Sequence, residues 1–289
     1  MSEKIFIIGG TGEIGTKLSR RLLSQSSNIT LYSRHAEKTK ELYPNANVIQ
    51  GDYTTTDVFE REIVGHTRLF ILVSAHDSMP QIKGSFAKIA YGAGVRQIVD
   101  ISSYHVNEPN RTGFIGVIHR ESEEAILAAK GHDQFYVTLR PARFYNTHIG
   151  LNGHSIKTSQ CLENIHAPES KEDFISSTDI AEVAFKVLTE PVEKHANCVY
   201  TMIGDSLSTN ERAAIFSEAL GKPIKANVIP IQAMYDRLTA FGFPHAIAVD
   251  FIQRRESQGP TPYFEVIIGR PPQSFREWLQ ENNNFEKFK

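Results

Sequence analysis

The stretch Ile5-Phe6-Ile7-Ile8-Gly9-Gly10-Thr11-Gly12-Glu13-Ile14-Gly15 decides the fold of this 289-residue chain. Its four apolar residues are typical of a buried strand, and the apolar residues from Ile14 onward repeat with the period of a helix. The glycines match both GxxGxxG and GxGxxG. Such a turn lets the backbone approach a diphosphate, and the helix that follows offers free N–H groups and a positive dipole end. We therefore predict a dinucleotide-binding turn rather than incidental glycines, with these candidate contacts: Gly9, Gly10, Thr11, Gly12, Glu13, Ile14 and Gly15.

The rest of the first half repeats the alternation of strand and helix. Short apolar runs predict strands at 29–32, 48–49, 69–73, 98–101 and 135–139. Apolar faces with helical spacing predict helices at about 14–23, 82–90 and 118–129. Continuous β-rich runs indicate strands that are buried on both faces. We therefore predict an α/β fold with a doubly wound (Rossmann), mostly parallel sheet.

The alternation breaks after Leu139. Residues 141–175 are rich in glycine and polar side chains, and we expect a loop region with one short helix there. Beyond it the patterns predict a helix at 179–188, a strand at 199–202, and helices at about 209–220, 231–241, 245–255 and 275–280. We predict a dinucleotide-binding domain at 1–150, which also receives the helix and strand at about 176–202. Residues 151–289 then form a smaller, mainly helical substrate-binding part.

Composition narrows the class of partner. A net charge of −2 argues against non-specific binding to nucleic acid or to a membrane surface. Cys161 and Cys198 show no CxxC spacing, and the histidines show no metal-binding spacing, so neither a disulfide framework nor a metal site is expected. No secretory segment and no apolar run of about 18 residues is visible. We expect a cytoplasmic protein with a small-molecule partner, either monomeric or homodimeric.

The end of the second predicted strand bears on the choice between NAD and NADP. NAD-binding proteins usually place an acidic residue there for the ribose 2′-hydroxyl. This chain has Tyr32-Ser33-Arg34-His35, with Lys38 one turn later. Arg34 can stack on adenine and bind a 2′-phosphate, with Ser33 and Lys38 beside it, although a solvent-facing arginine would look the same. We predict NADP(H). Asp52 after the third strand either accepts from the adenine amino group or forms a turn.

Several motifs in a fixed order resemble the NmrA-like group of atypical short-chain dehydrogenases. They are the glycine turn, Arg34, Gly51-Asp52, Leu139-Arg140-Pro141 with Phe144 and Asn146, the stretch from Phe174 to Ala181, and Gly269-Arg270-Pro271-Pro272. The group includes NADP-binding redox sensors, quinone and dye reductases, and isoflavone-reductase-like enzymes. The resemblance implies hydride transfer from NADPH, with Pro141 and Phe144 near the nicotinamide.

The acid–base pair of ordinary short-chain dehydrogenases is missing. None of the ten tyrosines has a lysine four residues later, and Ile115-x-x-x-His119 stands where the Tyr-x-x-x-Lys pair is expected. His119 has an ordinary pKa near working pH, so it can donate to the ribose or to the substrate, or it can simply bond to backbone. Three more catalytic or cofactor-binding candidates follow the fifth strand, with capping or loop packing as the alternative: Ser102, Ser103 and Tyr104. Ser74 after the fourth strand is a further cofactor-binding candidate.

Two functions fit these features. The first is an NADPH-dependent reductase of a small apolar carbonyl, quinone, imine or alkene, since the cofactor itself carries most of the chemistry. The second is a non-catalytic NADP(H)-binding redox sensor, which the missing pair favours. Six aromatic residues of the second half either line a substrate pocket or form the core: Phe144, Tyr145, Tyr235, Phe241, Phe243 and Phe251.

Overall fold

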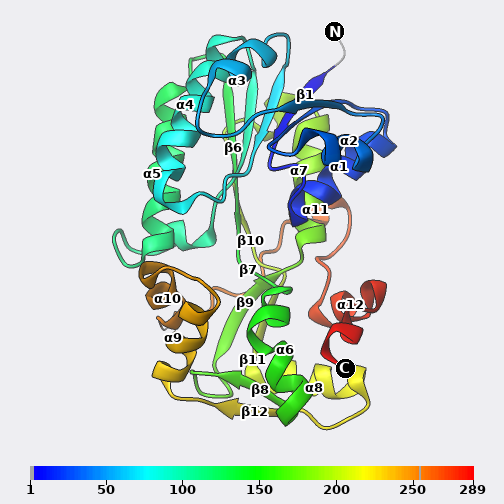
Figure 1. Cartoon of the computed structure of the whole chain (residues 1–289), viewed down its shortest axis with the longest axis vertical. Coiled ribbons are helices and arrows are strands. Elements are labelled where there is room, and N and C mark those ends of the chain that lie inside the picture. Colours follow the sequence, from blue (N-terminus) through cyan, green and yellow to red (C-terminus); the bar gives the residue numbers. More distant parts are fainter. Residues whose placement is uncertain (1–2, 254) are drawn as a thin grey trace.

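The computed structural model describes residues 3–253 and 255–289, and its centre is a seven-stranded parallel sheet (Figure 1). The strand order is β10-β6-β5-β4-β1-β2-β3, and every neighbouring pair is parallel. The strands are β1 (Lys4–Ile8), β2 (Asn28–Ser33), β3 (Asn47–Gln50), β4 (Arg68–Ile71), β5 (Gln97–Ile101), β6 (Phe135–Pro141) and β10 (Val199–Met202). The predicted doubly wound α/β fold is confirmed. The order reverses between β1 and β4, and ligands bind such sheets at the carboxyl ends of the strands beside that reversal.

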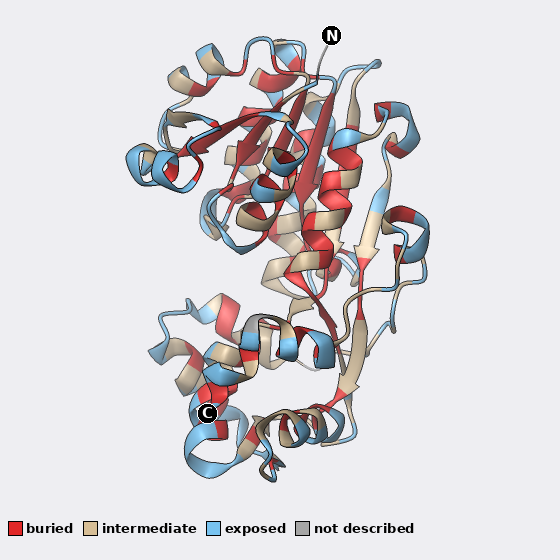
Figure 2. Ribbon diagram, turned by 90° about the vertical axis from the view of Figure 1, so that its right-hand side faces the viewer, coloured by how far each residue is buried: buried red, intermediate tan, exposed pale blue. Residues whose placement is uncertain are grey.

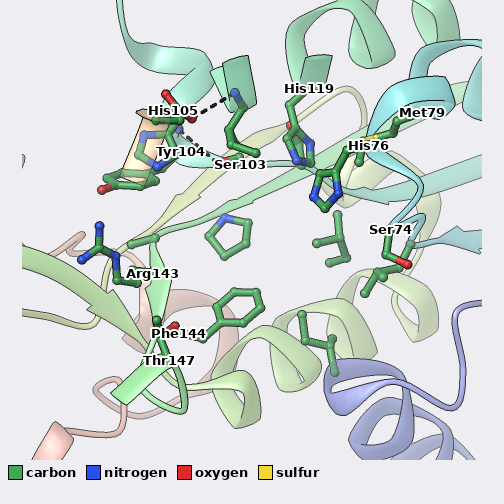
Figure 3. Close-up of a pocket in the computed structure, with 18 of the residues that line it drawn as sticks. Ser74, His76, Met79, Ser103, Tyr104, His105, His119, Arg143, Phe144 and Thr147 are labelled. Atoms are coloured by element: carbon green, nitrogen blue, oxygen red, sulfur yellow. Dashed lines mark hydrogen bonds between the residues drawn. The ribbon is translucent and has the colours of Figure 1, made fainter. Parts of the chain in front are cut away.

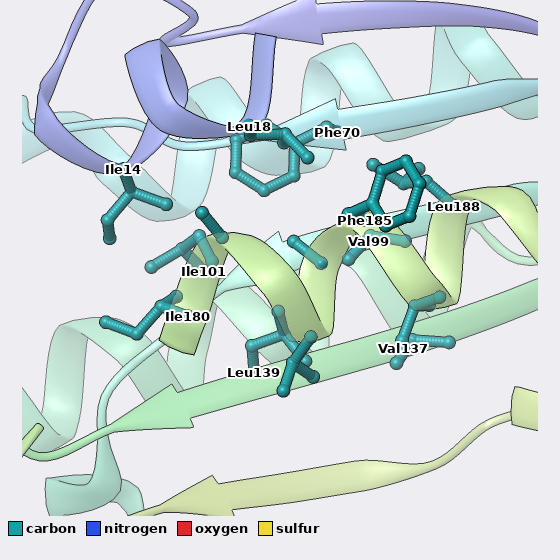
Figure 4. Packing of buried hydrophobic residues seen from close by; sticks show 14 of the residues in the cluster. Ile14, Leu18, Phe70, Val99, Ile101, Val137, Leu139, Ile180, Phe185 and Leu188 are labelled. Carbon is teal, nitrogen blue, oxygen red and sulfur yellow. The ribbon is translucent and has the colours of Figure 1, made fainter. Parts of the chain in front are cut away.

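Helices cover both faces of this sheet, and the strands between them are buried (Figure 2). On one face lie α1 (Glu13–Ser24), α7 (Ser177–Thr189) and α11 (Phe264–Ile268). On the other lie α3 (Asp57–Glu62), α4 (Met79–Gly92) and α5 (Phe114–Ala129). Figure 4 shows side chains of this cluster. Leu18 of α1 lies near Phe70, and Ile180 of α7 lies near Ile101 and Leu139 of the strands. Burial on both faces explains why these strands read as continuous apolar runs.

The second part of the chain lies beyond the carboxyl ends of the sheet and contains more strand than we predicted. It carries a three-stranded sheet, β11-β9-β7, and a two-stranded sheet, β12-β8. Their strands are β7 (Arg143–Phe144), β8 (Cys161–Asn164), β9 (Lys171–Ile175), β11 (Asp205–Ser208) and β12 (Lys225–Val228). The prediction of a loop with one short helix over 141–175 was therefore wrong. These strands have at most five residues, too few to establish a period, and most pair with segments far along the chain.

Helices make up most of this part, as predicted. They are α6 (Thr147–Ser159), α8 (Thr209–Leu220), α9 (Ile231–Ala240), α10 (His245–Ile252) and α12 (Phe275–Gln280). The remaining elements are α2 (Ala36–Leu42) beside the large sheet and the short 3₁₀ segments η1 (His76–Ser78), η2 (Tyr104–Asn107), η3 (Val192–His195) and η4 (Glu281–Phe288). The helix at 245 ends three residues earlier than expected, at Ile252.

Polar contacts join α10 and the segment after it to the large sheet's helices. The Asp250 carboxylate accepts from the backbone N–H of Ile115 at 3.0 Å, in the first turn of α5. Arg255 donates to Asp250 at 2.6 Å and to Glu108 at 2.7 Å. This connection holds α10 over the end of the sheet where a ligand is expected.

Candidate functional site

The glycine turn between β1 and α1 is built by close backbone contacts. Gly9 has φ +86°, a conformation that side chains rarely adopt, and a Cβ there would stand 2.7 Å from the Leu72 carbonyl oxygen. A Cβ on Gly10 would stand 2.7 Å from a methyl group of Leu31. At Gly15 a Cβ would lie 2.0 Å from the Gly9 carbonyl oxygen. Gly9 and Gly10 therefore let the turn lie close to Leu72 and Leu31, and Gly15 lets α1 pack close to the turn, whatever binds there.

Gly12 has a different environment. It caps α1 with an extended backbone, and no side chain caps this helix end. A Cβ on Gly12 would meet only the Gly9 carbonyl oxygen, at an ordinary 3.6 Å. The first turn of α1 thus presents uncapped N–H groups beside open space, which is the arrangement that a diphosphate needs. The residues present fit a dinucleotide.

Other residues of the turn have separate tasks. The Glu13 carboxylate accepts from Ser177 at 2.8 Å and from the amide of Asn146, so it ties the start of α1 to the start of α7 and to the residue before α6. Thr11 is exposed, and Ile14 reaches the cavity described below.

No acidic residue stands directly at the end of β2, where Arg34 and His35 follow Ser33, and two cations lie near this point. Arg34 and Lys38 are exposed. Ser33 is buried, and its hydroxyl accepts from Thr39 at 2.8 Å and from the His35 backbone at 3.2 Å, so it braces this turn. The Ser33 hydroxyl is therefore already engaged within the protein.

Asp52 acts as a turn former in the structure. One carboxylate oxygen accepts from the Thr54 hydroxyl at 2.5 Å and from the Thr54 backbone N–H at 2.8 Å. These bonds, with a smaller contribution from the Arg34 guanidinium, lower the pKa of Asp52. The nearby Arg34 places a positive charge at the end of β2, where NAD-binding proteins usually have an acid.

A cavity of about 310 Å³ opens at the carboxyl ends of the strands, beside the start of α1 (Figure 3). It brings together eight of the predicted residues: Ile14, Ser74, Ser102, Ser103, Tyr104, His119, Pro141 and Phe144. Much of the wall is apolar, with Leu72, Val73, Ile101 and Ile115 among its residues. The cavity is thus continuous with the glycine turn through Ile14, and it suits an apolar ring.

His119 projects from α5 into this cavity, facing His76 from η1 (Figure 3). Its Nδ1 atom is buried and has no hydrogen-bond partner among the described residues. Burial, and then the nearby positive charges of which Lys83 is the strongest, lower the pKa of His119 well below its usual value. This shift favours the neutral imidazole and argues against a histidine that titrates near neutrality. Its unpartnered nitrogen is available to a ligand.

The serines after β5 are engaged within the protein. The Ser102 hydroxyl donates to Glu123 at 2.5 Å, and Arg140 binds the same carboxylate. The Ser103 hydroxyl accepts from the His105 backbone at 3.3 Å and caps η2. The capping alternative therefore describes Ser103, and Ser102 reaches the cavity with its hydroxyl turned toward α5.

Tyr104 and several residues that the sequence did not single out complete the cavity. Tyr104 is buried, and burial raises its pKa to about 12. The residues missed are His76, Met79, Arg143, Thr147, Asp250 and Arg255. Arg143 alone had a signal, because it stands between Pro141 and Phe144. Asp250 and Arg255 lie more than 100 residues away from these in sequence, so only the fold brings them in.

Of the six aromatic residues proposed for a pocket, only Phe144 and Phe251 line this cavity. Tyr145 is buried in the core of the second part and donates to Asp205 at 2.9 Å. Tyr235 packs beside α10, while Phe241 and Phe243 are 59% and 37% exposed. The pocket interpretation was wrong for these four residues.

The described ranges hold neither a cluster of metal ligands nor a helix that could span a membrane. Within residues 3–253 and 255–289, no three or more His, Cys, Asp or Glu side chains are grouped so as to hold a metal ion. Over the same residues, no helix has the length and apolar character that crossing a membrane requires.

The family is identified by a match over residues 9–191 to the model described as NAD(P)H-binding. The chain belongs to this NAD(P)H-binding family. The match begins at the first glycine of the turn and ends beyond α7, so it includes every strand of the large sheet except β1 and β10. A nicotinamide dinucleotide as cofactor, as predicted, is thereby confirmed.

Two curated relatives of this family member are named as reductases. The (4-alkanoyl-5-oxo-2,5-dihydrofuran-3-yl)methyl phosphate reductase of Streptomyces griseus is 25% identical over 285 residues, covering 96% of this chain and 97% of the relative. The NAD(P)H azoreductase of Xenophilus azovorans is 25% identical over 292 residues, covering 96% of each. The expectation of an NAD(P)H-dependent oxidoreductase family is confirmed.

Solved structures show the same fold over nearly the whole chain. The NADPH-dependent quinone oxidoreductase QOR2 from Escherichia coli, complexed with NADPH, matches with a TM-score of 0.81 at 20% identity, covering 97% of this chain and 100% of that one. A variant of NmrA matches with a TM-score of 0.76 at 16% identity, covering 99% and 96%. The fold expected from the resemblance to the NmrA-like group is therefore confirmed.

Proposed function

We propose that the chain is an NADPH-dependent reductase of a small apolar carbonyl, quinone, imine or alkene. The observation that carries the proposal is the cavity of about 310 Å³, which adjoins the uncapped start of α1 and is lined largely by apolar side chains. Bound at α1, NADPH supplies the hydride, so the protein's task is to orient an acceptor and to exclude water. The reductase names of both curated relatives support the same reaction class.

The residues at the phosphate end have distinct tasks in this proposal. The N–H groups at the start of α1 bind the diphosphate, and the space beside Gly12 admits it. Arg34 and Lys38 bind the ribose 2′-phosphate, since both are exposed at the end of β2 and no acid stands there. We assign Ser33 and Asp52 to shaping this turn, because their side chains already bond within it.

At the nicotinamide end, Ile14, Pro141 and Phe144 form the apolar contacts of the ring. His119 stands where short-chain dehydrogenases keep the lysine that holds the nicotinamide ribose. Its neutral imidazole can donate or accept one hydrogen bond to a ribose hydroxyl through the nitrogen that lacks a partner. Ser74, exposed at the cavity's edge after β4, is a further contact on this side.

The test is a substrate panel with the purified protein and NADPH. Quinones, conjugated ketones and cyclic imines are supplied in turn, and loss of nicotinamide absorbance is followed. Reduction of at least one class, at a rate that depends on Gly12, supports the proposal. If NADPH binds tightly and no class is reduced, the non-catalytic redox sensor describes the protein better.

A further inference from the structure

One end of the cavity presents a phenol and a guanidinium that the cofactor does not need. Tyr104, at the start of η2, and Arg143, in β7, line the cavity together, and Figure 3 shows them on the side away from His76 and His119. Both also line a smaller adjoining pocket. Among the described residues, the Tyr104 hydroxyl has no hydrogen-bond partner, although the side chain is only 8% exposed.

Among the described residues, Arg143 donates hydrogen bonds through one of its guanidinium nitrogens only. Its Nη1 donates to Glu172 at 2.6 Å, and the group lies 5.2 Å from the ring centroid of Phe251. Glu172 also binds Arg212 at 2.5 Å, so one carboxylate serves two arginines. The Nε and Nη2 groups of Arg143 have no acceptor within residues 3–253 and 255–289. Arg143 therefore keeps donors and a share of uncompensated charge for a ligand.

The other charged groups near the phenol are already occupied. Arg255 is bound by Glu108 and Asp250. Asp173 accepts from the Ser257 hydroxyl at 2.5 Å and from the Gln258 backbone at 2.7 Å, and also from Ser206.

Burial raises the pKa of Tyr104, and among the neighbouring charges Arg143 opposes this most. The phenol is thus a protonated donor at neutral pH, and Arg143, which shares Glu172 with Arg212, lines the same cavity.

We propose that Tyr104 and Arg143 form a phenol–cation pair that binds the carbonyl oxygen of the substrate. This pair lies elsewhere in the fold than the Tyr-x-x-x-Lys pair of ordinary short-chain dehydrogenases. This inference rests on the proposed function and narrows its substrates to quinones and ketones, whose oxygen gains negative charge as the hydride arrives. With a ketone, a C–H bond forms between the hydride of NADPH and the carbonyl carbon, and the C=O π electrons move to the bound oxygen. With a quinone, the hydride bonds to another atom of the conjugated system, and the electrons move through that system to the bound oxygen. Arg143 stabilises that oxygen, the Tyr104 proton bonds to it, and water then returns a proton to the tyrosinate. NADPH is oxidised to NADP⁺ and the carbonyl is reduced.

The experiment compares two hydride acceptors that differ in their need for a proton. A quinone needs a hydride and a proton, whereas a cationic triphenylmethane dye is neutralised by the hydride alone. Tyr104→Phe should lower kcat/KM for the quinone by about 100-fold, in the range of a lost general acid. Arg143→Met should lower it by at least about tenfold. Neither change should lower kcat/KM for the dye.

Two controls accompany these variants. Arg61→Met removes an arginine whose side chain is 68% exposed and pairs only with Glu62, so it should leave both rates unchanged. Arg143→Lys keeps the charge and should recover part of the quinone rate. Thermal melting of each variant shows that it is folded, and Arg212 still neutralises Glu172 when Arg143 is absent.

A second readout needs no turnover. 4-Nitrophenol resembles the developing oxyanion, and its anion is visible by absorbance. Bound to the wild type, it should ionise at lower pH than when bound to either variant, with a preference for the anion that is about tenfold stronger.

Equal loss of quinone and dye reduction in the variants, or equal nitrophenol ionisation in wild type and variants, overturns the inference. If the wild type reduces neither of these acceptors nor any other in the panel, the proposed function fails, and the nitrophenol titration alone decides whether this end of the cavity binds an oxyanion.

Discussion

The carbonyl oxygen of Gly9 would lie only 2.0 Å from a Cβ atom on Gly15, so the two residues lock the start of α1 against the end of β1. A Cβ on Gly12 would approach the same oxygen no closer than 3.6 Å. Glycines of one motif therefore serve different purposes. Gly15 serves the packing of helix on strand, whereas Gly12 leaves room for a ligand.

Gly12→Val should abolish NADPH binding while the protein stays folded. The Gly12 backbone has φ −75° and ψ 179°, which any residue adopts, and the new side chain would fill the space beside the uncapped N–H groups. Calorimetry with NADPH and a melting curve measure the two effects. Normal affinity in this variant would place the phosphate site elsewhere.

Gly15→Ala should lower the free energy of unfolding, even in the absence of the cofactor. Overpacking against a backbone group costs typically about 1–3 kcal/mol, and here the clash is with a carbonyl oxygen that cannot turn aside. Urea unfolding without cofactor measures the cost. A midpoint equal to that of the wild type would contradict the packing assigned to this glycine.

Arg34→Ala should weaken NADPH binding by about tenfold or more and leave NADH almost unchanged. A charge-assisted bond to the 2′-phosphate contributes about 1.5–3 kcal/mol, and NADH lacks that group. Arg61→Ala, on the exposed surface of α3, serves as the control for a lost positive charge. The idea fails if calorimetry finds that the wild type binds NADH as tightly as NADPH.

His119→Ala should weaken NADPH binding by up to about tenfold, because a neutral hydrogen bond contributes about 0.5–1.5 kcal/mol. The pKa of His119 lies well below its usual value, so the imidazole stays neutral as pH rises through 6 to 8. The pH profile of kcat/KM should then show no ionisation of this residue in that range. An ionisation near pH 6.5 that disappears in the variant would show that His119 is the general acid after all.

Asp100→Asn should destabilise the protein strongly. Asp100 and Lys83 are both fully buried beneath the cavity, with 2.6 Å between carboxylate and ammonium. Removing one partner of such a pair leaves a buried charge uncompensated, which costs about 3–5 kcal/mol. The double variant Lys83→Met with Asp100→Leu should recover much of the lost stability, because no buried charge remains. Denaturant unfolding measures the stability of the single and the double variant. Equal stability of the single variant and the wild type would contradict this.

The strands of the large sheet were predictable because each is a run of apolar residues long enough to be recognised. The run Leu69–Val73 overlaps β4 from Leu69 to Ile71, and Ile98–Ile101 lies within β5. The strands of the second part were not predictable from the sequence. For example, β7 has two residues and pairs with β9 about 30 residues later. Such short segments carry no periodic signal, and tertiary pairing alone makes them strands.

The sequence by itself determined the parts of this protein whose physical cause is local. A glycine turn between strand and helix, a basic residue after β2 and apolar runs are each readable within a few residues, and they predicted the fold and the cofactor class. The tertiary structure decided what each polar group in the cavity can do. Burial and Lys83 lower the pKa of His119, Glu123 accepts from Ser102, and Arg143 and Tyr104 line the same cavity. Charge, desolvation and hydrogen-bond partners depend on neighbours that the fold brings from distant parts of the chain.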